Sequence, residues 1–407
     1  MIHPAPLASL SLLLSGLAAL AKVASADSQT NDFEDLPVYD TPFDNITHHY
    51  IVGPYRTSFK VKTVGTWGEL KGNLYAGSEN ITERRPPVTF CPIGNHSFWF
   101  YGYNDNYNED VKISGLAIGT SSLHPQHAVD IPVPLGNDGF YDVVPTSSED
   151  LSVQATFANL IIPRSLCVAI NSTTSVQFWD AYVDSGSRGS VMTVYTIEDD
   201  AATLHVTRPQ DVYGDAYNNE YEFGLFASLV VNKVIYLYAL DVSSYGNSRQ
   251  LLVARSHIDT FTDKSTWTYW TGSKWTAVEP TATAAASSES VIYELPDDQQ
   301  FYMGTTPFAS GGSIFYSDYH HAYLMIFVSS ADTSSYIIEY APTPIGPWTT
   351  NRKVLYTDNT YAIHSSLATP AFFSSPLINA ASGKQLMLTP SNTDDQYGCY
   401  VQKLIFS

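Results

Sequence analysis

The sequence predicts an all-β protein, organised as a β-propeller, from three observations. Runs of β-branched and aromatic residues with period-2 or continuous hydrophobicity recur along the chain. Turn dipeptides such as Gly311-Gly312 and Ser382-Gly383 separate these runs, and no helical stripe extends for a dozen residues. Many short strands with regular turns over about 380 residues exceed one ordinary sandwich, which favours radial repetition.

The expected strands share one composition. Val, Ile, Thr, Tyr, Phe and Trp dominate them, and turn residues follow at their ends. In chain order, the expected strands are 97–104, 174–183, 190–197, 231–240, 322–330, 335–341 and 384–391.

An outer hairpin is expected between residues 254 and 276. A strand ends at Ala254-Arg255, a loop follows, and a second strand leads to a tight turn at Thr271-Gly272-Ser273. Segment 336–356 repeats the order of strand, loop, Gly-Pro-Trp and strand about 85 residues later, which indicates successive blades. Because aromatic burial dominates core energetics, we expect packing roles rather than ligand contacts for Trp267, Trp270, Trp275 and Trp348.

The N-terminus has the pattern of a secretory signal peptide, residues 1–26. Residues 7–20 have almost no polar content, the segment ends in Ala24-Ser25-Ala26, and the polar Asp27 follows. No later window reaches the roughly 20 apolar residues that a membrane helix needs. We therefore expect a secreted, extracellular protein that is not inserted in a membrane.

Charge and glycosylation motifs agree with that expectation. The formal net charge is −20, which would repel phosphate backbones and anionic lipids, so neither nucleic acid nor membrane is an expected partner. The chain is expected to be a monomeric glycoprotein. Acceptor sequons for N-glycosylation begin at Asn45, Asn80, Asn95 and Asn171.

The cysteines and the absence of known catalytic motifs limit the kinds of site that the sequence predicts. Cys91, Cys167 and Cys399 are the only cysteines, and either Cys91 pairs with Cys399 or all three are buried thiols. None has zinc-site spacing, so no metal is expected. The sequence contains no nucleophile elbow, P-loop or dinucleotide fingerprint, so we expect no cofactor.

Three stretches resemble a known family. They are "LLVARSHIDTFTDKSTWTYWTGSKW" (251–275), "YAPTPIGPW" (340–348) and "YAIHSSLATPAFFSSPLINAASGKQLMLTPSN" (361–392). They are similar to secreted five-bladed β-propellers long classified as a domain of unknown function, some of which are endo-D-arabinanases. A more distant similarity is to arabinanase and xylosidase-type propeller glycosidases. The resemblance implies a five-bladed propeller over 86–407, with 27–85 either closing the ring or forming an N-terminal extension.

The resemblance also matches individual residues of this chain to positions in the family's blades. The family's first blade carries Gly-Asp-Thr, where this chain has Gly102-Tyr103-Asn104, so the aspartate is replaced unless Asp105 substitutes for it. His364 matches a cavity-facing histidine of the last blade. Segment 211–240 matches the third blade, where a Tyr-Gly segment enters a strand over the cavity.

Glycosidase chemistry needs two carboxyl groups, one protonated as general acid and one ionised as base or nucleophile. In a propeller they come from different blades, so candidates are acids in or beside strands with aromatic neighbours. Asp180 is the clearest, because a charge after Phe178-Trp179 is costly to bury without a role or a partner. The expected catalytic set is Asp180, Glu222 and Asp105, with Glu220 and Asp318 as lesser candidates.

Aromatic residues near these acids are expected to bind substrate. Tyr213, Tyr217 and Tyr221 alternate before a strand, and their rings could stack on sugar faces. Alternating tyrosines also suit a half-exposed sheet, and this alternative stays open. Tyr103 and His364 complete the expected binding residues. His320-His321 is expected in a surface turn.

Three functions are compatible with the sequence. The first is a secreted glycoside hydrolase-like propeller that acts on a polysaccharide or oligosaccharide, with arabinan or another furanoside glycan as the substrate that the resemblance implies. The second is a non-catalytic glycan-binding propeller, which Tyr103 in place of an aspartate favours. The third is a protein-binding wall or effector protein that uses the outer faces of the propeller.

Overall fold

The structure is a computed structural model in which the chain divides into two compact units, Met1–Val38 and Tyr39–Ser407. All described residues belong to the second unit. They are 61–69, 81–93, 96–106, 112–119, 144, 160–163, 165–183, 186–197, 204–210, 213–215, 219–241, 250–281, 291–294, 312–317, 319–328, 335–348, 353–356, 369–371, 385–389, 391–392 and 398–406.

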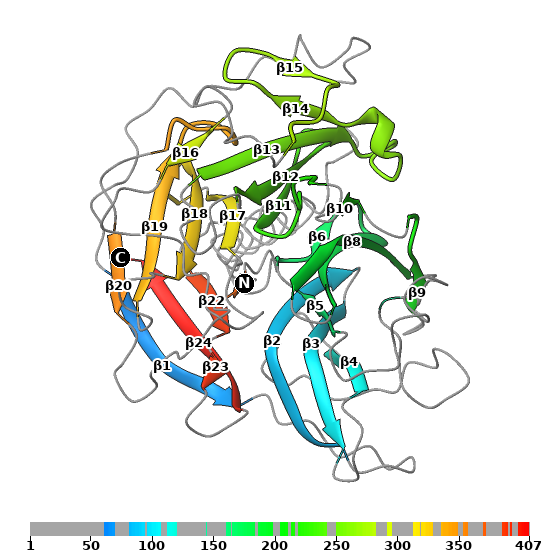
Figure 1. Ribbon diagram of the computed structural model, residues 1–407. Helices are drawn as coiled ribbons and strands as arrows, with labels where there is room; N and C mark the ends of the chain where they lie inside the picture. Colours follow the sequence, from blue (N-terminus) through cyan, green and yellow to red (C-terminus); the bar gives the residue numbers. More distant parts are fainter. Residues whose placement is uncertain are drawn as a thin grey trace, which may run out of the picture. The chain divides into compact units, whose positions relative to one another are not determined.

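The described residues form an all-β structure of five antiparallel sheets, which confirms the predicted all-β class (Figure 1). Their one helical element is a single 3-10 turn, Lys264–Thr266, which Asp263 caps by accepting a hydrogen bond from Ser265 N. No helix in this part of the chain is long or apolar enough to cross a membrane.

Two sheets follow one another in the first half of the chain. The first contains β2 (Ile81–Ile93), β3 (His96–Asn106) and β4 (Lys112–Gly119) in sequence order. In the second, the order β10-β8-β7-β5 places the two long strands at the centre, with β6 paired to β7 and β9 to β8. Its strands are β5 (Leu160–Pro163), β6 (Val168–Ala169), β7 (Thr174–Val183), β8 (Gly186–Ile197), β9 (Leu204–Thr207) and β10 (Gly214–Asp215).

The next two sheets also run in sequence order. The third has the order β11-β12-β13-β14-β15, with β16 paired to β13, and the fourth has the order β17-β18-β19-β20. The third sheet's strands are β11 (Ala227–Val231), β12 (Val234–Leu240), β13 (Gln250–His257), β14 (Thr268–Trp270), β15 (Trp275–Thr276) and β16 (Tyr293–Glu294). The fourth sheet's strands are β17 (Gly312–Ser317), β18 (Ala322–Val328), β19 (Ser335–Ala341) and β20 (Lys353–Tyr356).

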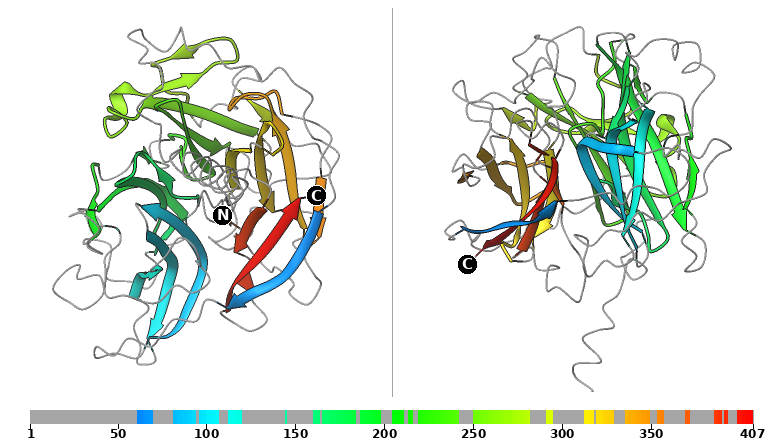
Figure 2. Two further views of the ribbon diagram at one scale, coloured as in Figure 1. Left: turned by 180° about the vertical axis from the view of Figure 1, so that it is seen from behind. Right: turned by 90° about the horizontal axis from the view of Figure 1, so that it is seen from below.

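The fifth sheet joins the two ends of the described chain. It contains β21 (Thr369–Ala371), β22 (Gln385–Thr389), β23 (Ser391–Asn392) and β24 (Gly398–Phe406). β1 (Val61–Glu69) pairs with β24, from Val61 opposite Phe406 to Glu69 opposite Tyr400. The blue and red strands lie side by side in both views of Figure 2. The first described strand is therefore held by the last one.

Each sheet contacts the next. β2 contacts β6 and β7, β6 contacts β11, β11 contacts β17, and β17 contacts β21. β21 and β24 of the fifth sheet contact β2 of the first, so the series of contacts closes. Hydrogen bonds cross between sheets: Ser228 Oγ donates to Leu166 O at 3.2 Å, and Gly312 N donates to Phe226 O at 2.8 Å.

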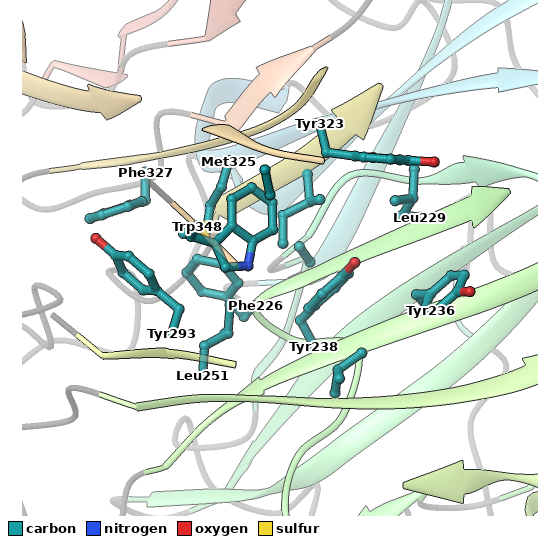
Figure 3. Close-up of a cluster of buried hydrophobic side chains, with 14 of the residues drawn as sticks. Phe226, Leu229, Tyr236, Tyr238, Leu251, Tyr293, Tyr323, Met325, Phe327 and Trp348 are labelled. Carbon is teal, nitrogen blue, oxygen red and sulfur yellow. The ribbon is translucent and has the colours of Figure 1, made fainter. Parts of the chain in front are cut away.

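Among the residues that the structure describes, three clusters of buried hydrophobic side chains fill the spaces within and between the sheets. The largest lies between the third and fourth sheets, where Trp348 sits among Phe226, Met325 and Tyr238 (Figure 3). Trp348 and Trp267 are buried, and Trp270 and Trp275 are partly buried against the same cluster as Trp348. The predicted packing role of these tryptophans is confirmed.

The cysteine pairing differs from both predicted alternatives. Cys91 forms a disulfide with Cys167, and their Cα atoms are 4.8 Å apart. The cause is the contact between neighbouring sheets, since Cys91 lies on β2, and Cys167 directly precedes β6, which β2 contacts. The side chain of Cys399 lies outside the described residues.

Replacing Tyr293 by Phe tests a polar link inside the largest cluster. The Tyr293 hydroxyl donates to Glu339 Oε1 at 2.9 Å, and Glu339 is fully buried on β19. We expect Tyr293→Phe to lower the free energy of unfolding by about 1–2 kcal/mol, because a buried carboxyl loses a hydrogen-bond donor. Urea titration measures this difference, and an unchanged unfolding midpoint would show that the hydrogen bond contributes nothing.

Candidate functional site

Asp180 lies near the end of β7 and is 3% exposed. It is directly opposite Ser190 on β8 and Ile162 on β5. Opposite residues of an antiparallel pair project to the same face, and alternate residues of a strand do too. Asp180 therefore shares its face with Ser190 and Phe178, while Trp179 packs in the cluster on the other face.

The segment that carries Glu222 covers this face. Gly214 on β10 pairs with Ser190, and Tyr213 N donates to Ser190 O at 2.7 Å. A Cβ atom on Gly214 would overlap the carbonyl oxygen of Tyr221 and would lie 3.0 Å from Glu222 Cα and 3.1 Å from Ser190 Oγ. Only a glycine lets the chain pass this closely. The structure thus brings Asp180 and Glu222, two of the predicted acids, to one face of the second sheet.

Ser190 adds a polar atom to this face. The residue is fully buried, and within the described part of the chain its Oγ has no hydrogen-bond partner. A buried hydroxyl without a partner is costly unless water or a ligand completes it. Glu222 itself is half-buried, so its carboxyl lies closer to solvent than that of Asp180.

Tyr221 and Asp241 extend the site toward the third sheet. Tyr221 is buried, and burial together with the nearby charge of Asp241 raises the pKa of its hydroxyl to about 12. Asp241 is 5% exposed and directly follows β12. Asp241 was not among the predicted site residues, although an acid that follows the continuous apolar run 234–240 resembles the pattern that singles out Asp180.

Of the three tyrosines predicted to stack on sugars, the structure describes Tyr213 and Tyr221. Tyr213 stacks on Trp267 with ring centroids 5.3 Å apart, and its hydroxyl donates to Thr262 O at 2.6 Å. Burial, and then the charge of Asp263, raise the pKa of Tyr213. Tyr213 and Tyr221 are each only 1% exposed, so neither lies on a half-exposed sheet face and neither offers a ring face to solvent.

Glu220, a lesser candidate, belongs to an ion-pair cluster instead. Lys264 Nζ donates to Glu220 Oε2 at 2.7 Å and lies 2.9 Å from Glu279 Oε2. Asp215 N also donates to Glu220 Oε2, at 3.0 Å. This cluster, which we call the Lys264 clasp, joins the segment before β11 to the hairpin of β14 and β15. It holds Glu220, two residues before Glu222, in place.

Glu279 gives the Lys264 clasp a pH dependence. Burial raises the pKa of the Glu279 carboxyl above its ordinary value of 4.5, the nearby Lys264 opposes this, and the charge of Glu220 adds to it. Glu279 was not among the predicted residues, because nothing in its local sequence distinguishes it from a surface glutamate.

Replacing Glu279 by Gln should change how stability depends on pH. The folded protein holds the Glu279 proton more tightly than the unfolded chain, so this carboxyl costs stability as the pH rises from 4.5 through the raised pKa. We expect wild type to lose stability relative to Glu279→Gln over that window. Urea unfolding at several pH values from about pH 4 to about pH 8 measures it. Parallel curves for the two proteins would contradict the assignment.

Other predicted residues lie on β3 or outside the described residues. Asp105 pairs with Glu83 and Tyr103 pairs with Arg85 through the β3 backbone, but neither side chain is described. Outside the described residues lie Tyr217, Asp318 and His364.

The predicted surface turn at His320-His321 is half right. His321 is exposed in a turn with a φ of 53°, but His320 is fully buried. Its Nδ1 is 2.8 Å from Ser317 Oγ, and its ring packs against Tyr319 and Tyr340. The turn itself buries the residue, since it folds His320 back toward β17.

No group of three or more His, Cys, Asp or Glu side chains that could hold a metal ion occurs among the described residues.

This is an all-β protein of repeated antiparallel sheets. The sheets contact one another in a closed series, and carboxyl groups lie where two of them meet. Residues 170–375 match the family described as "Domain of unknown function (DUF5005)", and the chain belongs to that family. No curated protein matches the sequence significantly.

Solved structures give a similarity at the level of the fold. A Bacteroides ovatus protein described as a "putative hydrolase" matches with a TM-score of 0.53 and 14% identity, covering 79% of this chain and 85% of that one. A family 117 glycoside hydrolase from Zobellia galactanivorans matches with a TM-score of 0.46 and 9% identity, covering 86% and 90% of the two chains. The alpha-L-arabinofuranosidase of Podospora anserina matches with a TM-score of 0.45 and 9% identity, covering 86% and 97%.

Proposed function

We propose that this protein is an exported glycoside hydrolase with a five-bladed β-propeller fold. The observation that carries the proposal is the buried carboxyl of Asp180, which shares one sheet face with the segment that carries Glu222. Glycosidase chemistry requires such a pair of carboxyl groups, and here one comes from β7 and the other from the segment that precedes β11.

The blade assignment rests on the sheets. Each of the five sheets is one blade, because each contacts the next and the fifth contacts the first. β1 completes the last blade by pairing with β24, which ties the beginning of the folded region to its end. Closure of this kind removes the open ends that an array of sheets would otherwise expose.

The proposed reaction uses the two carboxyls in different protonation states. One donates a proton to the oxygen of the glycosidic bond as that bond breaks, and the other, ionised, activates water or attacks the sugar carbon. Asp180 and Glu222 supply this pair, and Asp105 on the first blade is the third candidate. The substrate class is polysaccharide, with arabinan or another furanoside glycan as the substrate that the family resemblance suggests.

A glycan-binding propeller without catalysis is the second candidate. The sequence favours it at Gly102-Tyr103-Asn104, where the family resemblance leads us to expect an aspartate. A propeller that retains its fold and one acid could hold a sugar chain without cleaving it, since hydrolysis needs two carboxyls.

Incubating the purified mature protein with arabinans, xylans, galactans and fungal wall glucans at acidic pH separates the two candidates. Oligosaccharides released from one polymer, detected by mass, would support hydrolysis. Retention of the protein on a polymer without release would support the binding module. Neither release nor retention on any polymer would sink both candidates.

Export is part of the same proposal. The signal peptide at 1–26 and the acceptor sequons support a secreted monomeric glycoprotein whose mature chain begins at Asp27. N-terminal sequencing of the protein from culture medium tests this, and a chain that stays in the cells with Met1 intact would contradict it.

A further inference from the structure

The turn between β6 and β7 presents an Asn-Ser-Thr sequence to solvent. Asn171, Ser172 and Thr173 are all exposed. Ile170 N and Asn171 N donate to Thr174 O at 2.8 and 3.2 Å, which closes the turn. Ile197 N at the end of β8 donates to Thr173 O at 2.9 Å and fixes the turn to the neighbouring strand. The sequence is therefore held at the surface in one conformation.

The side chain of Asn171 uses its oxygen within this turn. Asn171 Oδ1 accepts hydrogen bonds from Thr173 N at 2.9 Å and from Thr173 Oγ1 at 3.1 Å. Asn171 Nδ2 makes no hydrogen bond to any described residue, and the residue is exposed. The nitrogen of the amide, the atom to which an N-linked sugar is attached, is thus left at the solvent side.

We propose that Asn171 carries an N-linked glycan. The proposal rests on the export proposed above, because this modification belongs to the secretory route. In the attachment, Asn171 Nδ2 bonds to the anomeric carbon of an oligosaccharide carried on a lipid diphosphate. The bond from that carbon to the diphosphate oxygen breaks, one amide proton passes to solvent, and the lipid diphosphate leaves.

The position of the glycan is compatible with an open site at Asp180. Thr174, the first residue of β7, follows the turn, and Asp180 is six residues further along the strand. At the rise of a β-strand these two residues are about 20 Å apart. A glycan on Asn171 therefore stands at the opposite end of β7 from Asp180 and leaves the proposed substrate site accessible.

Peptide mapping of the full chain secreted from a eukaryotic host tests the proposal. Enzymatic release of N-glycans in heavy-oxygen water converts a glycosylated Asn into labelled Asp. We expect label at Asn171 in wild type and in the matched variant Thr173→Ser, which keeps a hydroxyl, and none at this position in Thr173→Ala or Asn171→Gln. A secreted wild-type chain with an unlabelled Asn171 would overturn the proposal, whether or not the variants fold.

The test of the Asn171 glycan gives its result independently of the proposed enzymatic function. Glycan occupancy is measured by peptide mass, and hydrolysis by oligosaccharides released from a polymer. A labelled Asn171 in a protein that neither cleaves nor binds any polymer would support the glycan and contradict the function. An active, secreted protein with an unmodified Asn171 would do the reverse.

Discussion

Replacing Asp180 by Asn should reduce glycan hydrolysis by at least about 100-fold, because the amide cannot transfer the proton that general acid or base catalysis needs. Asn has nearly the same size as Asp, so we expect the packing of this buried position opposite Ser190 to be retained. The measurement is the initial rate of oligosaccharide release from the polymer that wild type cleaves. Full activity of Asp180→Asn would exclude Asp180 from catalysis.

The matched control for this prediction is Asp259→Asn. Asp259 also loses one negative charge on substitution, but its side chain is 77% exposed and lies on the loop after β13. We expect its activity to equal that of wild type. A loss of similar size in both variants would mean that net charge, and not Asp180 itself, determines the rate.

A structural role for Asp180 gives a different result. A buried carboxyl with partners stabilises the fold, and removing its charge then lowers the unfolding midpoint without a specific effect on the rate. Rates are therefore measured at a temperature where both proteins are folded, and urea titration supplies the stability. Loss of activity at unchanged stability assigns Asp180 to the reaction.

Strand positions could be predicted from the sequence where a run of apolar residues is bounded by turn residues. The expected strands 174–183 and 335–341 coincide with β7 and β19. The expected strand 231–240 was wrong at its start, because Asn232 and Lys233 have φ values of 51° and 61° and form a tight turn between β11 and β12. Asn tolerates this conformation, but Asn-Lys is a weaker turn signal than Asn-Gly.

The candidate site could be predicted only in part. Asp180 and Glu222 stand out locally, as charges among aromatic residues. That the Glu222 segment covers the Asp180 face depends on the pairing of Gly214 with Ser190, which joins two separate segments of the chain and leaves no local pattern. The same reason hid Glu279, whose partner Lys264 lies across a hairpin, and the disulfide of Cys91 with Cys167.

Replacing Gly224 by Ala should lower the free energy of unfolding by about 3 kcal/mol, from backbone strain and from overpacking together. Gly224 has a φ of 91°, a conformation that residues with a Cβ atom rarely adopt. An added Cβ would also overlap the ring of Phe178, which is fully buried on the Asp180 face of β7. The overlap includes Phe178 Cγ, the atom at the root of the ring, so the whole side chain would have to shift.

Gly272→Ala separates the two causes. Gly272 has nearly the same φ, 92°, but it is exposed in the turn before β15. Only the backbone strain applies there, so we expect a loss of about 1 kcal/mol. Urea unfolding of both variants measures the difference, and the excess loss in Gly224→Ala is the cost of displacing Phe178. Equal losses would show that the Phe178 ring moves freely, which would contradict a rigid packing between β7 and the Glu222 segment. Because Gly224 is two residues from Glu222, that packing fixes the Glu222 segment against β7, and the same comparison tests whether the candidate site is preorganised.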